Sequence, residues 1–147
     1  SIHSFPTRRS SDLLYGTAFM KAAAAINGKS DIDVKDYIKI LEGALSGVMM
    51  RGKAQRGEKT MIDALAPAIV AMKKAENAGQ TALGILKASK DGAMQGVEYT
   101  KTIIATKGRA SYLGERSIGH QDAGATSSYL ILNTIFEEVK NINESKV

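Results

Sequence analysis

The chain has 147 residues and no cysteine, which excludes disulfides and thiolate metal sites as sources of its stability. Its 44% hydrophobic and 24% charged residues are ordinary for one soluble globular domain with a core of its own. The net charge of +5 is mild, and basic residues cluster only at 51–59 and 107–116, which favours local anion sites over a nucleic-acid-binding face. No apolar run approaches the ~20 residues of a membrane span and no secretory signal is recognisable, so we expect a cytoplasmic protein without a membrane or nucleic-acid partner.

The first residues differ from the rest of the chain, because residues 1–13 mix Pro, Ser, Arg and Asp without any apolar period. The stretch HSFPTRRSSDL, from His3 to Leu13, matches without a mismatch the in-frame translation of a common sequencing-library adapter. We therefore expect residues 1–13 to be a non-native segment and native sequence to resume at about Leu14. An apparent basic N-terminal arm would then be an artefact.

Beyond residue 13 the apolar spacing is helical, and no run alternates with a period of two for long enough to predict a strand. A first helix over about 15–26 ends at Asn27-Gly28, a left-handed C-terminal signal. A second helix begins after Asp33, an N-cap candidate, and ends before Arg51-Gly52. Its apolar residues share one side: Val34, Tyr37, Ile38, Leu41, Ala44, Leu45 and Val48.

Three further helical stretches follow. Pro67 must kink or divide the helix predicted within "TMIDALAPAIVAMKKAENAG". A long amphipathic run starts at Thr81 and continues to about Thr106, with Gly92 and Gly96 as weak points. The last helix covers about 123–141. Short connections between helices predict an all-α antiparallel up-and-down bundle or barrel, in which about five helices remain.

The segment "KGRASYLGERSIGHQDAG" is the exception, because it has no helical period and is long for a connection inside a compact bundle. The helix start in "GHQDAGATSS" would offer free N–H groups and a positive dipole end to a phosphate, with Arg109 and Arg116 adding charge. The alternative is that Asp122 is an N-cap that uses the same donors. Arg116 would then be a surface partner of Glu115, and His120 would brace the loop.

A second loop, "GKAQRGEKT", approaches the phosphate-loop pattern but fails it. Glu58 intervenes before Lys59-Thr60, and the preceding element is predicted to be a helix where that motif requires a strand. We therefore interpret it as a solvated basic loop in which Thr60 caps the next helix.

Together, "RGKAQRGEKTMIDALAPA" and "KGRASYLGERSIGHQDAGATS" closely resemble the nucleotide-binding L subunit, or L domain, of dihydroxyacetone kinase. The resemblance extends from about Leu14 to about Val139, so that residues 14–147 are expected to form a partial L domain. It implies a barrel of antiparallel helices that holds ADP or ATP with two Mg²⁺ ions at one end. The residues that it implies for nucleotide binding are Gly52, Met61, Arg109, Gly124, Ala125 and Thr126.

The resemblance also implies partners. In the phosphotransferase-system form, tightly held ADP is rephosphorylated by a phosphocarrier subunit and passes the phosphoryl group to dihydroxyacetone bound by a K subunit. In the ATP-dependent form the L domain is fused behind the K domain. Met61 would offer a soft apolar contact to the base, and Arg109 would meet the phosphates. Ala123 stands where the family usually has proline, which should loosen this turn modestly.

A larger departure is that the aspartate-rich motif, whose three aspartates bind Mg²⁺ in the family, does not occur ahead of "LYGT". Asp31 and Asp33 lack its pattern, so no metal ligand is assigned and no catalytic residue is identified. Since phosphoryl transfer depends on that charge neutralisation, we expect the chain as written to be inactive alone. Two alternatives stay open: a non-catalytic helical module that binds a K subunit or a regulator, and a related kinase for another small substrate.

Overall fold

The computed structural model describes residue 17 and residues 32–145. The segment 1–13 and the helix predicted over 15–26 lie outside these residues, apart from Thr17, which has helical backbone geometry. The described part contains only helices: α2 (Val34–Gly52), α3 (Ile62–Asn77), α4 (Ala82–Thr100), the 3-10 helix η2 (Arg109–Ser117) and α5 (Ala123–Ser145). None of these helices is long and apolar enough to cross a membrane.

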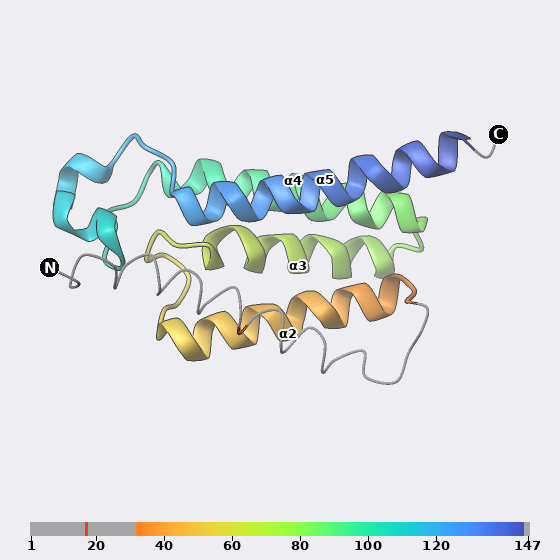
Figure 1. Ribbon diagram of the computed structural model, residues 1–147, viewed down its shortest axis with the longest axis horizontal. Helices are drawn as coiled ribbons and strands as arrows, with labels where there is room; N and C mark the ends of the chain where they lie inside the picture. The colour runs from red at the N-terminus through yellow and green to blue at the C-terminus, as the bar shows by residue number, and fades with distance from the viewer. Residues whose placement is uncertain (1–16, 18–31, 146–147) are drawn as a thin grey trace, which may run out of the picture.

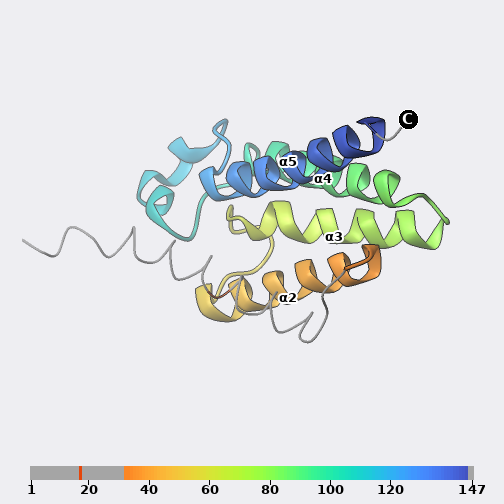
Figure 2. The same ribbon diagram turned by 45° about the vertical axis from the view of Figure 1, so that its right-hand side comes forward.

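The four α-helices run antiparallel in chain order, as Figure 1 shows. Helix α3 lies between α2 on one side and the pair α4 and α5 on the other, and the turned view in Figure 2 keeps this order. The loops that follow α2 and α4 therefore meet at the same end of the bundle, on the left in Figure 1. The predicted all-α antiparallel bundle is confirmed for the described residues.

The core lies between these helices and has small residues on α3. Ala64, Ala68 and Met72 of α3 have no exposed surface. They pack with Ile38 and Leu41 of α2 and with buried residues of α4 and α5, such as Val97 and Leu132. The apolar face predicted for α2 thus points inward.

Capping residues explain where two helices begin. Asp33 accepts a hydrogen bond from Asp36 N at 2.8 Å, and the Asp36 carboxylate accepts from Asp33 N at 3.2 Å, which is a capping box at the start of α2. Thr81 caps α4 by accepting from Gly84 N at 3.1 Å. Both boundaries agree with the sequence prediction.

Pro67 does not divide its helix, because α3 is continuous from Ile62 to Asn77. The glycines predicted as weak points of α4 instead allow α4 to approach α3 closely. A Cβ at Gly92 would lie 2.7 Å from the Pro67 carbonyl oxygen, and one at Gly96 would lie 1.9 Å from the Asp63 carbonyl oxygen. Only glycine permits this approach of two backbones.

The region after α4 also differs from the prediction. Helix α4 ends at Thr100, several residues before Thr106, because the Lys101 carbonyl accepts a hydrogen bond from Gly119 N at 2.7 Å and so turns to another segment. The segment expected to lack helical structure contains η2, which is interrupted at Gly114 with φ 56°. Short 3-10 turns satisfy the hydrogen-bonding groups of the backbone locally, so they form without a periodic pattern of apolar residues.

Candidate functional site

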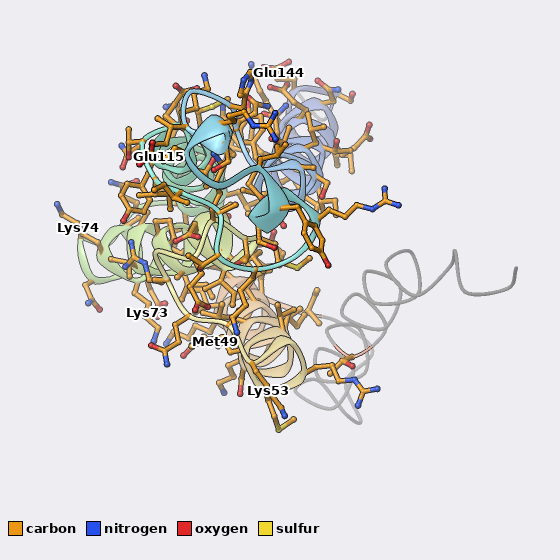
Figure 3. The ribbon with its side chains drawn as sticks, turned by 90° about the vertical axis from the view of Figure 1, so that its left-hand side faces the viewer. Met49, Lys53, Lys73, Lys74, Glu115 and Glu144 are labelled. Carbon is orange, nitrogen blue, oxygen red and sulfur yellow. The ribbon has the colours of Figure 1, made fainter. Side chains whose placement is uncertain are left out.

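The candidate site is the end of the bundle that faces the viewer in Figure 3, where the 53–61 loop, the 101–122 loop and the start of α5 meet. Its residues come from segments that are far apart in the sequence. The arrangement depends on a small number of buried polar side chains, which are described in turn below.

Asp63 organises the 53–61 loop. Its carboxylate is 1% exposed and accepts hydrogen bonds from Gly57 N at 2.7 Å and Thr60 N at 3.0 Å. The Thr60 hydroxyl accepts in turn from Ile62 N at 3.2 Å, but the N-cap position of α3 is Met61, one residue after the predicted Thr60. These bonds satisfy N–H groups ahead of α3 and give the loop one defined shape.

Lys59 contradicts the interpretation of this loop as solvated throughout. The residue is only 3% exposed, and its backbone has φ 63°, a left-handed conformation that is uncommon for a non-glycine residue. Its ammonium donates to the carbonyl oxygens of Ile103, at 3.3 Å, and Ser117. Lys59 therefore joins the 53–61 loop to the 101–122 loop.

The 101–122 loop closes on itself at the same place. The Ser117 hydroxyl accepts from Ala105 N at 3.0 Å, and Lys101 accepts from Gly119 N. We call residues 101–105 with 117–119 the neck and residues 106–116 the tip. The tip, which includes Arg109, is mostly exposed.

The start of α5 is built around Asp122, whose carboxylate accepts from Ala125 N at 2.8 Å. The Asp122 backbone N–H donates to the Thr100 hydroxyl at 3.0 Å, which ties α5 to the end of α4. Thr126 N–H and its hydroxyl both donate to the Asp122 carbonyl, at 3.0 and 2.7 Å. The N-cap alternative is thus the arrangement observed: the Asp122 carboxylate uses the Ala125 donor, while the Thr126 N–H makes the ordinary helical bond to the Asp122 backbone carbonyl.

The charge of Asp122 is disfavoured where it lies. Burial raises the pKa of its carboxyl above the ordinary value, and the nearby charge of Asp63 raises it further. The hydrogen bonds from Ala125 and Gly124, together with the Lys59 ammonium, oppose this increase only in part. Asp63, Asp122 and Lys59 therefore form one electrostatically linked group at this end of the bundle.

The structure brings together several of the site residues predicted from the sequence. A Cβ at Gly124 would lie 3.4 Å from Met61 N and from Met61 Cβ, so the start of α5 touches the start of α3. Met61 is 7% exposed and packs with Val48 of α2. Gly52 is the last residue of α2 and lies at the same end of the bundle.

Arg109 is not in contact with this group. It is the first residue of η2, it is exposed, and no hydrogen bond or ion pair of the described residues involves its guanidinium. Arg116 and His120 are exposed as well, and the predicted Arg116–Glu115 ion pair is not formed. Arg109 is therefore a cation free to meet an anion from solution.

The described residues offer no metal centre, because they contain no group of three or more His, Asp or Glu side chains that could hold an ion. Mg²⁺ therefore does not fit the described part of the site by itself. Sequence reasoning missed Lys59 and Asp63, since nothing in the local pattern marks a lysine whose partners lie more than forty residues away.

The family model and the curated relatives that match this chain are described by similar names. The model of a family described as the DAK2 domain matches residues 7–137. The match begins inside the segment 1–13, whose origin stays a prediction. Similar curated proteins include the "PEP-dependent dihydroxyacetone kinase 1, ADP-binding subunit DhaL" of Listeria innocua, which is 40% identical over 84% of this chain.

Two further relatives have similar names. The "PEP-dependent dihydroxyacetone kinase, ADP-binding subunit DhaL" of Escherichia coli is 37% identical over 83% of this chain. The "PTS-dependent dihydroxyacetone kinase, ADP-binding subunit DhaL" of Lactococcus lactis is 40% identical over 86%. The matches cover only 57%, 58% and 57% of the lengths of these three relatives.

Proposed function

Because the chain belongs to the DAK2 domain family, we propose that it is the nucleotide-binding part of a dihydroxyacetone kinase, with ADP held where the 53–61 loop meets the start of α5. The observation that carries the proposal is the contact between Met61 and Gly124. It unites two motifs that are more than sixty residues apart in the sequence, and both resemble motifs of the kinase L subunit.

In this proposal Arg109 supplies the charge that meets the phosphates, because it is exposed and has no partner among the described residues. Gly52 and Met61 line the nucleotide from the other side. The N–H groups of Gly124 and Ala125 take part if the phosphate replaces the Asp122 carboxylate to which they now donate, and the Thr126 hydroxyl follows them on the first turn of α5.

The reaction proposed is transfer of a phosphoryl group from the nucleotide to dihydroxyacetone held by a K subunit, in the cytoplasm. The relatives named above as PEP- or PTS-dependent favour the form that is recharged by a phosphocarrier subunit over the ATP-dependent form. Mg²⁺, when bound, neutralises phosphate charge. The described residues contain no cluster of three or more His, Asp or Glu side chains, so residues outside them would have to contribute its ligands.

Nucleotide binding tests the proposal directly. Mg-ADP is titrated, by calorimetry, into a version in which residues 1–13 are replaced by the longer N-terminal segment of one of the relatives. We expect Arg109→Ala to weaken binding at least about tenfold, since a charge-assisted contact contributes roughly 1.5–3 kcal/mol. Thr126→Ala should weaken it by a smaller factor.

The control is Lys74→Ala, which removes an exposed cation in the last turn of α3, at the opposite end of that helix. It should leave the affinity unchanged. If Arg109→Ala and Thr126→Ala both bind Mg-ADP as tightly as the parent, the nucleotide does not occupy this end of the bundle.

A further inference from the structure

Lys59 has no role in the proposed nucleotide contacts, yet it is only 3% exposed and is, with Asp63, one of two nearly fully buried charged residues of the site. This burial lowers the pKa of Lys59, while the charge of Asp122 raises it. A buried charge of this kind is retained only where specific partners replace water.

Those partners lie on both sides of the neck. Ile103 belongs to the segment that leaves α4, and Ser117 belongs to the segment that returns toward α5. The Lys59 ammonium donates to both carbonyl oxygens, so one side chain joins the two segments where the loop begins and ends. A weaker backbone contact, from Thr106 N to the Glu58 carbonyl at 3.4 Å, lies beside it.

The backbone of Lys59 supports the same conclusion. Its φ of 63° costs energy for a residue with a Cβ, and the contacts that bury Lys59 offset that cost. Lys53 has a similar φ of 49° but is exposed at the end of α2. Figure 3 labels Lys53 at the outer side of this end of the molecule. The two lysines share a backbone conformation and differ in their contacts.

We propose that Lys59 is a positioning residue for the nucleotide site: its ammonium holds the neck closed and so fixes how the Arg109 tip faces the start of α5. The effect of Lys59 on ADP affinity rests on the proposed function. Its effect on the neck rests on the geometry alone. Lys59 itself touches no phosphate in this arrangement.

The test compares Lys59→Met, Lys59→Arg and Lys53→Met with the parent, all in the version that carries the N-terminal segment of a relative. Methionine keeps much of the length and apolar character of lysine but leaves the Ile103 and Ser117 carbonyls without their donor. Hydrogen exchange is measured at Ala105 and Gly119, whose amides close the neck. Affinity for ADP with Mg²⁺ is measured on the same samples.

For Lys59→Met we expect exchange at the neck amides to rise at least tenfold and ADP affinity to fall about tenfold, while amides within α3 and α4 exchange as in the parent. Lys59→Arg keeps the charge and the donors, so it should restore most of the slow exchange at the neck amides and most of the ADP affinity. In Lys53→Met the exchange rates and the ADP affinity should stay within twofold of the parent, because Lys53 is exposed at the end of α2. It serves as the control because it changes the same type of side chain at a similar backbone conformation.

Two results overturn the inference: neck exchange that is unchanged in Lys59→Met, or a Lys59→Arg variant that behaves like Lys59→Met. If no variant and not even the parent binds ADP, the proposed function fails instead, and the exchange data still decide whether Lys59 holds the neck. The two failures are therefore distinguishable.

Discussion

At the scale of single residues, buried polar groups account for much of the behaviour expected of this protein. The hydroxyls of Tyr37 and Ser89 are buried and neither has a well-formed hydrogen bond. Burial raises the pKa of Tyr37 to about 12, and the nearby Ser89 hydroxyl opposes this only weakly. Tyr37 therefore stays neutral in the folded protein at pH values where a tyrosine in the unfolded chain ionises.

This difference predicts a loss of stability in alkaline solution. Between about pH 10 and 12 the unfolded state binds fewer protons than the folded state, so stability falls by about 1.4 kcal/mol per pH unit, or roughly 2–3 kcal/mol in all. Tyr37→Phe cannot ionise and should lack this contribution. Urea denaturation at pH 8 and pH 11 measures it.

The matched control for that measurement is Tyr112→Phe, because Tyr112 is 89% exposed in the tip of the loop. Tyr112→Phe should lose as much stability between pH 8 and pH 11 as the parent. Equal losses in the parent and in Tyr37→Phe would show that Tyr37 is not the group responsible.

Single residues also show which features could be predicted from the sequence and which could not. The capping roles of Asp33 and Thr81 depend on neighbours within a single turn, so they could be predicted. Lys59 could not, because its burial depends on the carbonyls of Ile103 and Ser117, which tertiary folding alone brings to it.

At the scale of elements, the close approach of α3 and α4 sets the shape of the bundle. Propensity assigns Gly92 and Gly96 an unfavourable role in a helix and predicts that Pro67 kinks or divides its helix. Helix α3 is continuous, so Pro67 does not divide it. Tertiary packing reverses the expectation for the two glycines, because the α3 backbone around Pro67 and Asp63 lies directly against them.

The packing predicts opposite results for two glycines of α4. Gly96→Ala would place its Cβ against backbone atoms of Asp63 and Ala64, which cannot move independently, so we expect a loss of about 3 kcal/mol or more. Gly84→Ala meets mainly the end of the flexible Gln80 side chain and should stay within about 1 kcal/mol of the parent. Thermal unfolding followed by circular dichroism compares them. Equal destabilisation by both would contradict the close packing of α3 on α4.

The two long loops show a different limit of prediction. The end of α4 at Thr100 and the presence of η2 follow from backbone bonds such as that between Gly119 and Lys101, not from a local pattern. The loops could nonetheless be recognised as functional candidates, because a long connection without helical period is uncommon in a compact bundle.

At the scale of the whole molecule, the antiparallel order of the helices is what creates the candidate site. Three connections of an up-and-down bundle alternate between its ends, so the loops after α2 and α4 share one end and the loop after α3 lies at the other. The helical periodicity predicted this arrangement. The contact of Met61 with Gly124 was expected only from the resemblance to a known family, since no periodic pattern relates the two residues.

We propose that the nucleotide binds at this end of the bundle and nowhere else. The most direct measurement follows the amide resonances of the chain extended with a relative's N-terminal segment during titration with Mg-ADP. We predict that the shifts concentrate at Gly52, Met61, Arg109 and residues 124–126, and that Gly79 and Thr81, at the opposite end, do not respond. Shifts that concentrate around Gly79 and Thr81, or no shifts at saturating Mg-ADP, would contradict the account.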